Sequence, residues 1–523
     1  MSIADDVLKA RADIAGLSVF SAIKKTPLVR AFERLLEEVS RQSLGQLDEG
    51  PGLTRERQPR NKAPIRLIRS WTAFTEALIQ LPVTKSPALL ATKFPAQSGA
   101  PSFYSQIAFL ALTDDNPFTR LAEHGAGSEG QRPDSQAEAS PKSAPIPAAL
   151  RSLAKNDLAR LGRLAAFDIP SLGAYIGAIL RKAGLDDSAT ALEEEARIIG
   201  AQGDKTQGAL FPVDTSWDRA LPDLEKYLEA QGAGELGLYS AFFWAGTRSG
   251  TSREAPRGAK CLRGELRCKL RPVTHPDPIR LSQLSGYEDQ RSIVIANTLR
   301  FLEGKAANNL LLYGDRGTGK SATVKAVCNE YASRRLRLLE LRKGDLTDLP
   351  AILDLLSTRF LRFIVFIDDL SFESTGDAFT TLKALLEGGV EARPDNVVVY
   401  ATSNRRHLVK EHMADRPTTA MAAEAVSTGD VRAFDSMQEQ FSLADRFGVT
   451  VVYTAPSQDE YLNIACFIAE QRGILSPSGG EEARQRFRED ALRWERWFNG
   501  RSPRTAVQFV DWAAAGGGFP WEI

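Results

Sequence analysis

Apolar side chains recur at helical spacing in the first part of the chain. One such stretch runs from Leu17 to Ser43, a second from Ile65 to Leu81, and a third from Phe103 to Leu112. Intervals of three and four residues place these side chains on one face of a helix, where they can pack into a core. Residues 1–124 are therefore expected to form an N-terminal helical region.

The helical pattern breaks at residues 125–147, which are rich in Gly, Ser, Pro, Gln and Glu and are expected to form a flexible linker. Helical spacing resumes from Ala148 to Arg181 and from Ser188 to Ile199. Residues 148–247 are therefore expected to form a second helical region. The aromatic run at 239–244 is interpreted as part of its core.

From about Val273 short apolar runs alternate with helical segments, which is typical of a parallel sheet with crossover helices. The five candidate strands are Asn309–Tyr313, Leu336–Leu341, Phe363–Ile367, Val397–Ala401 and Val449–Tyr453. The spacing is helical again beyond them. The sequence thus predicts an α/β core at 273–456, with a five-stranded parallel sheet and flanking helices, and a C-terminal helical region at 457–523.

The composition, 43% hydrophobic and 25% charged, is ordinary for a globular protein with sizeable cores. The 66 basic residues balance the 66 acidic ones, so net charge gives no reason to expect a polyanionic partner. Four cysteines are too few for a disulfide framework and fit a reducing compartment. No signal peptide and no apolar run of roughly 20 residues is visible, so a cytoplasmic location without a membrane partner is expected.

Residues 248–272 are an exception to the balanced charge. The stretch from Arg248 to Arg271 contains eight basic residues and only two acidic ones, Glu254 and Glu265. One interpretation is contact with nucleic acid. The other, which we prefer, is a solvated basic linker, because neither stacking aromatic residues nor a nucleic-acid motif accompany the charge.

A phosphate-binding loop follows the first candidate strand. Its eight residues fit the pattern G-x-x-x-x-G-K-[ST], namely Gly314, Asp315, Arg316, Gly317, Thr318, Gly319, Lys320 and Ser321. A strand that enters a glycine-rich turn and then a helix directs several backbone N–H groups, and the positive end of the helix dipole, at one anion. Lys320 is expected to reach the β- and γ-phosphates, and Ser321 to hold Mg²⁺. The alternative is a glycine-rich turn before an ordinary helix.

Two carboxylates end the third candidate strand. Asp368 and Asp369 follow the apolar run Phe363–Ile367, and carboxyl ends of parallel strands meet beside such a loop. Asp368 is expected to hold Mg²⁺ together with Ser321, and Asp369 to orient the water that attacks the γ-phosphate. Alternatively, the pair caps a helix or turn.

These motifs and the run Val397–Asn404 resemble the AAA+ ATPases, whose fourth strand ends in a polar sensor. The resemblance implies a P-loop nucleoside triphosphatase fold with a C-terminal helical lid, and ATP and Mg²⁺ as cofactors. Asn404 matches the sensor, which contacts the attacking water. Arg446, in the segment 442–448, matches the arginine finger that reaches a neighbouring subunit's nucleotide. A turn-forming Asn404 and a surface ion pair of Arg446 are the alternatives.

The resemblance also assigns residues at both ends of the core. Arg504, in the segment 500–506, matches the second sensor on the lid, with Arg501 as a competing candidate. Tyr287, in the segment 284–290, matches the part that lines the adenine pocket; alternatively, Tyr287 only packs against the first helix of the core.

Taken together, the motifs resemble a bacterial AAA+ family classed as a domain of unknown function, over roughly Val273 to Trp512. Two departures bear on activity. Asp369 stands where much of the class has Glu, so a shorter side chain must reach the water and turnover is expected to be slow. Residues 416–432, rich in Ala and Thr, resemble an insertion that contacts a partner or forms a loop.

The leading hypothesis is an ATP-hydrolysing conformational switch or remodeller. The resemblance implies a homo-oligomer with ATP at the subunit interface, acting on an unidentified protein client. The alternative is a loader-like ATPase that uses the basic stretch on nucleic acid. A small-molecule kinase would share the phosphate loop but would need an acceptor pocket.

Overall fold

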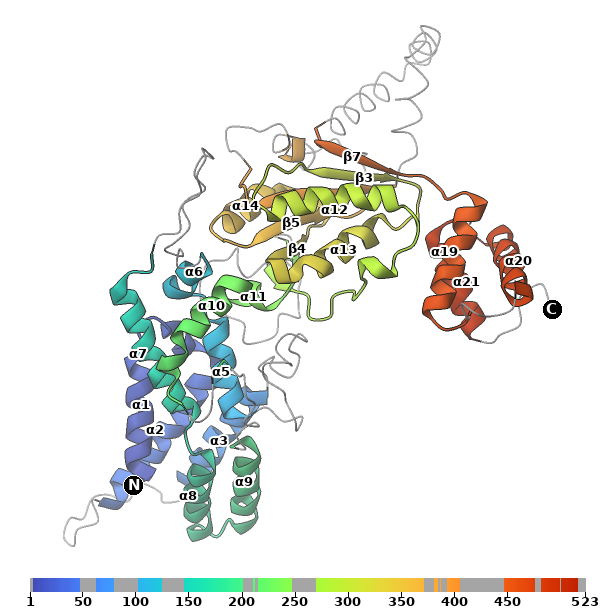
Figure 1. The fold of residues 1–523 in the computed structure, drawn as a ribbon. Coiled ribbons are helices and arrows are strands. Elements are labelled where there is room, and N and C mark those ends of the chain that lie inside the picture. The colour runs from blue at the N-terminus through green and yellow to red at the C-terminus, as the bar shows by residue number, and fades with distance from the viewer. Residues whose placement is uncertain are drawn as a thin grey trace, which may run out of the picture. The chain divides into compact units, whose positions relative to one another are not determined.

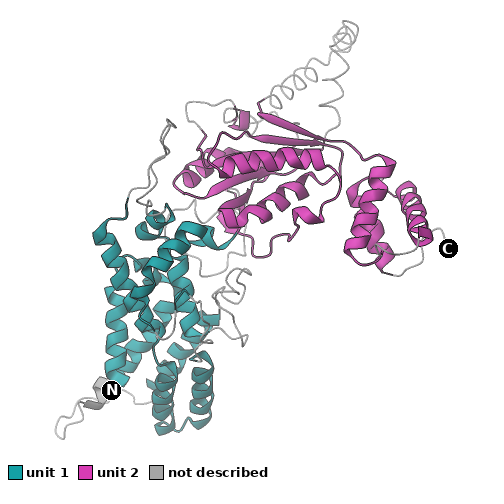
Figure 2. Ribbon diagram, in the orientation of Figure 1, with its two compact units in different colours: residues 1–239, 255–262 teal, residues 240–254, 263–523 magenta. Residues whose placement is uncertain are grey.

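The computed structural model describes residues 3–47, 63–79, 102–124, 145–200, 210–211, 215–246, 270–370, 381–383, 386, 393–404, 446–475, 481–498 and 500–515. Within these residues the chain divides into two compact units between Tyr239 and Ser240 (Figure 2). Each unit is described separately below.

In the described residues of the first unit the regular elements are all helices (Figure 1). Its helices are α1 (Ile3–Gly16), η1 (Ser21–Lys25), α2 (Pro27–Leu47), α3 (Ala63–Ile79), α5 (Phe103–Thr113), α6 (Pro117–Glu123), α7 (Ala148–Ala165), α8 (Ile169–Lys182), α9 (Asp186–Ile199), η3 (Trp217–Ala220), α10 (Leu221–Gln231) and α11 (Glu235–Leu238). The helical stretches expected at Ile65–Leu81 and Phe103–Leu112 correspond to α3 and α5, with residues 80 and 81 outside the described part of the chain, whereas the stretch expected from Leu17 to Ser43 is divided into η1 and α2.

The two helical regions expected on either side of residues 125–147 share one core. The ring of Phe32 on α2 lies 4.7 Å from Phe103 and 5.3 Å from Phe167 between ring centroids. Asp157, fully buried on α7, accepts backbone N–H groups of Ser18, Val19 and Phe20 at 2.8, 2.7 and 3.1 Å. The expected linker therefore joins two parts of one unit, and its residues 125–144 lie outside the described part of the chain.

The helix expected from Ala148 to Arg181 is two helices, α7 and α8. The break lies at Ala166–Asp168, where Asp168 accepts the backbone N–H of Ser171 and Pro170 follows at the second helical position. An N-cap aspartate and a proline in the first turn both favour a new helix start, and the hydrophobic spacing alone does not register this.

The second unit combines a sheet with helices. Its elements are β1 (Ala241–Trp244), β2 (Leu270–Pro272), η5 (Leu281–Gln283), α12 (Glu288–Leu302), β3 (Leu310–Gly314), α13 (Lys320–Tyr331), η6 (Ala332–Arg334), β4 (Leu336–Glu340), η7 (Lys343–Asp348), α14 (Leu349–Ser357), β5 (Arg362–Ile367), β6 (Val397–Ser403), β7 (Val449–Tyr453), α19 (Gln458–Gln471), α20 (Glu481–Trp497) and α21 (Pro503–Ala514).

The five expected strands are confirmed, and they pair in parallel in the order β4-β5-β6-β3-β7. β3, β5 and β6 are buried on nearly every residue, because helices cover the faces of such sheets, whereas the edge strand β7 is buried at only two of its five residues. α12 and α13 lie over one face (Figure 1), where Val294, Phe301, Val324 and Val327 pack against strand residues such as Leu312.

Two further strands extend the sheet to seven. β1 pairs in parallel with β4, and β2 pairs antiparallel with β1. The aromatic run at 239–244 is therefore core, as interpreted, but its strand part belongs to the sheet and not to the helical region. Phe242 and Trp244 are buried alternately along β1, and the Trp244 Nε1–H donates to Asp348 at 2.8 Å. A four-residue strand is too short for its alternation to be recognised in the sequence.

The lid expected at 457–523 contains α19, α20 and α21, which pack around Tyr461, Ala465, Trp494 and Phe509. Ser457 begins α19 with a capping box formed with Glu460. In the described part of the chain no single helix is long and apolar enough to cross a membrane; the bent pair α7 and α8, at 49°, meets those criteria only when the two are taken together.

Candidate nucleotide-binding site

The phosphate loop connects β3 to α13. Gly314 has φ of +137°, and a Cβ atom there would stand 2.0 Å from the Tyr453 carbonyl oxygen on β7, so only glycine fits. Gly319 has φ of +90° and stands immediately before α13, so the first N–H groups of the helix face the loop. This arrangement offers an anion both unpaired N–H donors and the positive end of the helix dipole.

Lys320 lies inside the loop and is only 5% exposed. Its Nζ donates to the carbonyl oxygens of Gly314 and Asp315 at 3.1 and 2.6 Å. Burial lowers the Lys320 pKa to about 8, while the neighbouring carboxylates of Asp315, Asp368 and Asp369 act in the opposite direction. The amine therefore carries its charge at neutral pH, as binding to phosphate requires.

Ser321 and Asp368 meet at the carboxyl edge of the sheet. The Ser321 hydroxyl donates to Asp368 Oδ1 at 2.6 Å, and the Thr402 hydroxyl donates to the same oxygen at 2.6 Å. A hydroxyl and a carboxylate are the oxygen ligands that Mg²⁺ prefers, with waters and phosphate oxygens completing its shell. The described residues contain no group of three or more His, Cys, Asp or Glu that could hold a metal by themselves.

Asp369 is held in an unusual backbone conformation, with φ of +52°. Its N–H donates to the Thr402 hydroxyl at 2.9 Å, and its Oδ1 accepts the Asn404 amide at 2.7 Å. Its Oδ2 lies 3.6 Å from the Lys343 ammonium. These contacts fix the carboxylate beside Asn404, where both side chains can contact one water.

Tyr287 stands at the start of α12 with φ of +61°. Its hydroxyl donates to the Thr454 carbonyl at 2.7 Å, and its ring lies 5.2 Å from that of Tyr453. Burial raises the pKa of Tyr287 well above its ordinary value, so the hydroxyl stays protonated. Ile464 of the lid lies close to Gly286, where an added Cβ would stand 3.0 Å from its Cδ1 atom.

The lid contacts the phosphate loop through the start of α21. The Arg504 N–H donates to the Gly317 carbonyl at 3.2 Å. The Arg504 side chain is exposed and lines the cavity, whereas the Arg501 side chain pairs with Glu495 of the lid at 2.9 Å. Of the two candidates for the second sensor, only Arg504 thus faces the loop.

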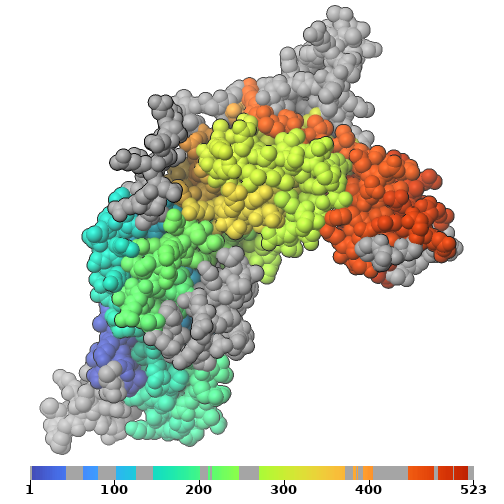
Figure 3. Space-filling model, viewed as in Figure 1, coloured from blue at the N-terminus to red at the C-terminus, as the bar shows by residue number. Residues whose placement is uncertain are grey.

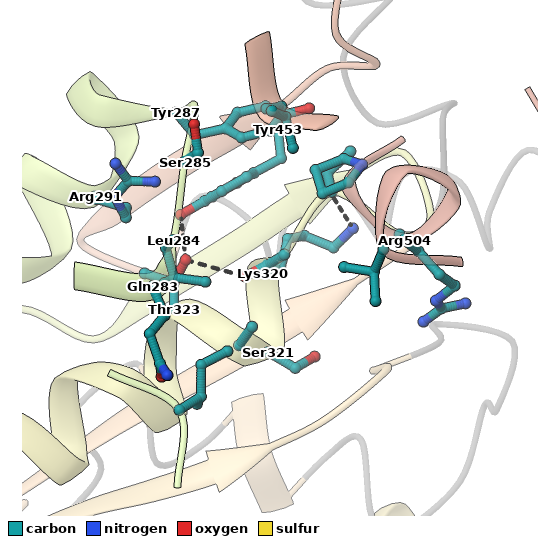
Figure 4. A pocket seen from close by; sticks show the side chains of 18 of the residues that line it. Gln283, Leu284, Ser285, Tyr287, Arg291, Lys320, Ser321, Thr323, Tyr453 and Arg504 are labelled. Atoms are coloured by element: carbon teal, nitrogen blue, oxygen red, sulfur yellow. Dashed lines mark hydrogen bonds between the residues drawn. The ribbon is translucent and has the colours of Figure 1, made fainter. Parts of the chain in front are cut away.

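A cavity of about 930 Å³ lies between core and lid. Tyr287, Arg316, Gly317, Thr318, Gly319, Lys320, Ser321, Asp368, Asp369, Asn404 and Arg504 all line it, and so bring the predicted residues together. Figure 4 shows Tyr287 and Tyr453 on one side, Arg504 on the other, and Lys320 between them. In the space-filling view the lid packs directly against the core (Figure 3).

Three predicted residues do not line the cavity. Gly314 and Asp315 shape the loop from behind, since the Asp315 N–H donates to Tyr453 O at 2.9 Å and its Oδ2 accepts the Ala455 N–H at 2.7 Å. Arg446 is half-buried and immediately precedes β7. Arg446 therefore lies at the amino edge of the sheet. The length of β7, about 13 Å, separates this edge from the carboxyl edge.

Several residues of the site were not predicted from the sequence. Thr402 follows the apolar residues of β6, and its position two residues before Asn404 is the signal that the sequence offers. Lys343 and Tyr453 come from segments without a motif. The lid residue Arg472 also lines the cavity. Two predicted segments lie outside the described residues, namely 416–432 and the basic residues 248–269.

The class of protein follows from this geometry. A phosphate loop after β3, an acid pair after β5, a polar residue after β6 and a helical lid after β7 define a P-loop ATPase fold of the AAA+ class. The sequence is also similar to one particular family. Residues 259–516 match the family described as "Protein of unknown function (DUF815)". This match confirms the resemblance indicated by the motifs.

Similarity to solved structures is distant. A mutant RuvB of Thermotoga maritima is 16% identical with a TM-score of 0.29, over 45% of this chain and 64% of that one. The Thermotoga maritima RuvB Holliday junction branch migration motor is 15% identical with a TM-score of 0.25, over 46% and 72%. The chain thus spans a little under two thirds of the first of these structures. A search of the curated proteins found no match.

Proposed function

We propose that this protein binds and hydrolyses ATP between subunits of a homo-oligomer and works as a conformational switch or remodeller. The observation that carries this proposal is the single cavity at which the phosphate loop, the acid pair, Asn404 and the lid residue Arg504 converge. A site shared by core and lid changes shape with its occupant, because phosphate contacts from both sides draw the lid inward.

The residues divide the chemistry among them. Lys320 and the N–H groups at the start of α13 bind the phosphates, and Asp369 with Asn404 orients the attacking water. Mg²⁺, held through Ser321 and Asp368, would neutralise charge on the phosphate oxygens. The site fits this ion because its two side-chain ligands are hard oxygens already in contact at 2.6 Å. Turnover is expected to be slow because Asp369 is shorter than Glu.

The intersubunit part of the proposal rests on Arg446. Its position at the amino edge of the sheet leaves it unable to reach the cavity of its own subunit. The segment 442–448 matches the arginine-finger segment of the AAA+ class, and a guanidinium that reaches a neighbour's nucleotide would stabilise charge in the transition state. We propose that Arg446 completes the site of the adjacent subunit.

Mixing two inactive variants tests this arrangement. We expect Lys320→Ala to lose nucleotide binding and Arg446→Ala to bind ATP but lose at least about 10³-fold in hydrolysis. Mixed together, they should recover part of the activity, because an intact loop of one subunit then meets the Arg446 of the other. The Lys320→Ala/Arg446→Ala double variant, mixed with Arg446→Ala, is the control that should recover nothing.

Two outcomes would contradict the proposal. Full hydrolysis by Arg446→Ala, with a rate per subunit that stays constant on dilution, would remove the intersubunit role. Unchanged affinity of Lys320→Ala for labelled ATP would overturn the nucleotide site itself.

The client can be sought with Asp369→Asn, which should bind ATP without hydrolysing it. We propose a cytoplasmic protein client, and a pull-down from cytoplasm with this variant should retain it. Lys320→Ala is the matched control, since a nucleotide-dependent client should be lost from it.

A second candidate is a nucleic-acid-associated ATPase. It is favoured by the eight basic residues between Arg248 and Arg271, which are separated from the paired residues Trp244 and Leu270 by only a few positions in the sequence. Salt-dependent DNA binding that disappears on charge reversal of Arg253, Arg257 and Arg263 would support this role, and no binding at low salt would exclude it.

A further inference from the structure

Asn329, near the end of α13, holds the main chain of one cavity wall. Its Nδ2 donates to the carbonyl oxygens of Asp277 and Ile279 at 2.7 and 2.9 Å. The backbone carbonyl oxygen of Asn329 accepts a hydrogen bond from the Arg280 guanidinium at 2.8 Å. One side chain thus fixes the wall on both sides of Pro278.

This wall lies beside the last turn of α13, whereas the phosphate loop lies at the start of that helix. Asp277, Pro278 and Ile279 line the cavity, together with the apolar side chains of Leu284 and of Ile464 and Ile468 from the lid. Apolar and aromatic surfaces suit the flat ring of a nucleoside base, whereas the glycine-rich loop suits phosphate.

α13 joins the two ends directly. It begins at Lys320 in the phosphate loop and reaches Asn329 nine residues later, or about 14 Å along a helix axis. Because a helix is stiff over this length, the clamp by Asn329 sets a fixed separation between the wall at 277–279 and the phosphate loop.

We infer that Asn329 is a positioning residue for the base of the bound nucleotide. It holds the wall at 277–279 at the distance from the phosphate loop that one nucleotide spans, and does not itself line the cavity. This inference rests on the proposed function, since it assigns the base end of the same site. Loss of the clamp should weaken contacts to the base and leave contacts to the phosphates intact.

Paired titrations with Mg·ADP and with inorganic tripolyphosphate test the inference. Tripolyphosphate occupies the phosphate loop without a base. Asn329→Leu, which removes both donors, should bind Mg·ADP about tenfold more weakly, because the wall is no longer held in place, and should bind tripolyphosphate as the unaltered protein does. Asn329→Asp, of the same size, should show the same selective loss if the leucine variant folds poorly.

Asn396 provides a matched control. Its Nδ2 donates to the carbonyl oxygens of Leu356, Arg359 and Leu361, at the opposite edge of the sheet. Asn396→Leu therefore removes a comparable set of contacts far from the base. It should lower the unfolding temperature and leave the ratio of the two affinities unchanged.

The outcomes separate the inference from the function on which it rests. Equal weakening of both ligands by Asn329→Leu, or no weakening of Mg·ADP, would overturn the positioning role while the nucleotide site stands. Failure of the unaltered protein to bind either ligand would overturn the proposed function and this inference with it.

Discussion

Thr402 connects the two carboxylates of the site. Its hydroxyl donates to Asp368 and accepts the N–H of Asp369, so one side chain orients both residues of the pair. An apolar residue of similar shape would leave the Asp369 N–H without this acceptor and free the Asp368 carboxylate to rotate. Residues that orient metal ligands in this way commonly control activity almost as strongly as the ligands themselves.

We therefore expect Thr402→Val to lower kcat about ten- to a hundredfold, with little change in the affinity for ATP. Thr402→Ser keeps the hydroxyl and should restore most of the rate. Steady-state ATPase assays and nucleotide titrations of both variants provide the comparison. Equal rates for the valine and serine variants would show that the hydroxyl has no part in the reaction.

Lys320 is the residue on which nucleotide affinity most depends. Removing its buried ammonium leaves the Gly314 and Asp315 carbonyl oxygens without their donor and the phosphates without their nearest cation. Lys320→Ala should therefore lose binding of Mg·ADP by calorimetry while remaining folded by circular dichroism. Heat of binding equal to that of the unaltered protein would contradict this prediction.

At the scale of elements, the contact of β3 with β7 constrains the phosphate loop. Gly314 pairs with Tyr453, and no side chain fits between them. The direction of α13 also determines where an anion can bind. The N-terminus of α13 opens at the carboxyl edge of the sheet, whereas carbonyl groups at the amino edge are bound by side chains such as Asn396 and Arg393. The N–H groups of the first turn of α13 are therefore available to an anion at the carboxyl edge.

Gly314→Ala should displace β7 or the loop, because the new Cβ atom would overlap the Tyr453 carbonyl oxygen at a φ that L-residues rarely adopt. We expect a loss of about 3 kcal/mol or more in unfolding free energy and no nucleotide binding. Gly344→Ala is the control, since an added Cβ there meets open space. Denaturant titration of both variants checks this, and similar midpoints would contradict it.

At the scale of the whole molecule, the division into units falls before β1 and not at Val273, where the sequence predicted the start of the core. β1 covers the edge of β4 with a ladder from Ala241 to Phe243, and Trp244 is completely buried. An uncovered inner strand with an apolar face is prone to pair with other chains.

A chain that begins at Ser240 should consequently stay soluble and bind Mg·ADP, whereas one that begins at Val273 should aggregate. Light scattering and nucleotide titration of the two fragments measure this difference. Equal solubility and affinity would mean that β1 and β2 are dispensable for the sheet.

The sequence by itself determined the five parallel strands, the lid helices and the residues of the phosphate loop. Strands buried on both faces require continuous apolar runs, and the loop requires glycine and lysine at fixed spacing, so both leave local signals. The resemblance of these motifs to the AAA+ class indicated the residues that line the cavity, from Tyr287 to Arg504.

Only the tertiary structure decided which distant groups share a contact. The roles of Thr402, Lys343 and Asn329 depend on hydrogen bonds and ion pairs between segments tens of residues apart, and nothing in their local sequence encodes the partner. The same holds for β1, whose four residues become a strand because β4 offers an open edge. Hydrophobic spacing is a property of neighbours in sequence, whereas these contacts are formed only when the chain packs in three dimensions.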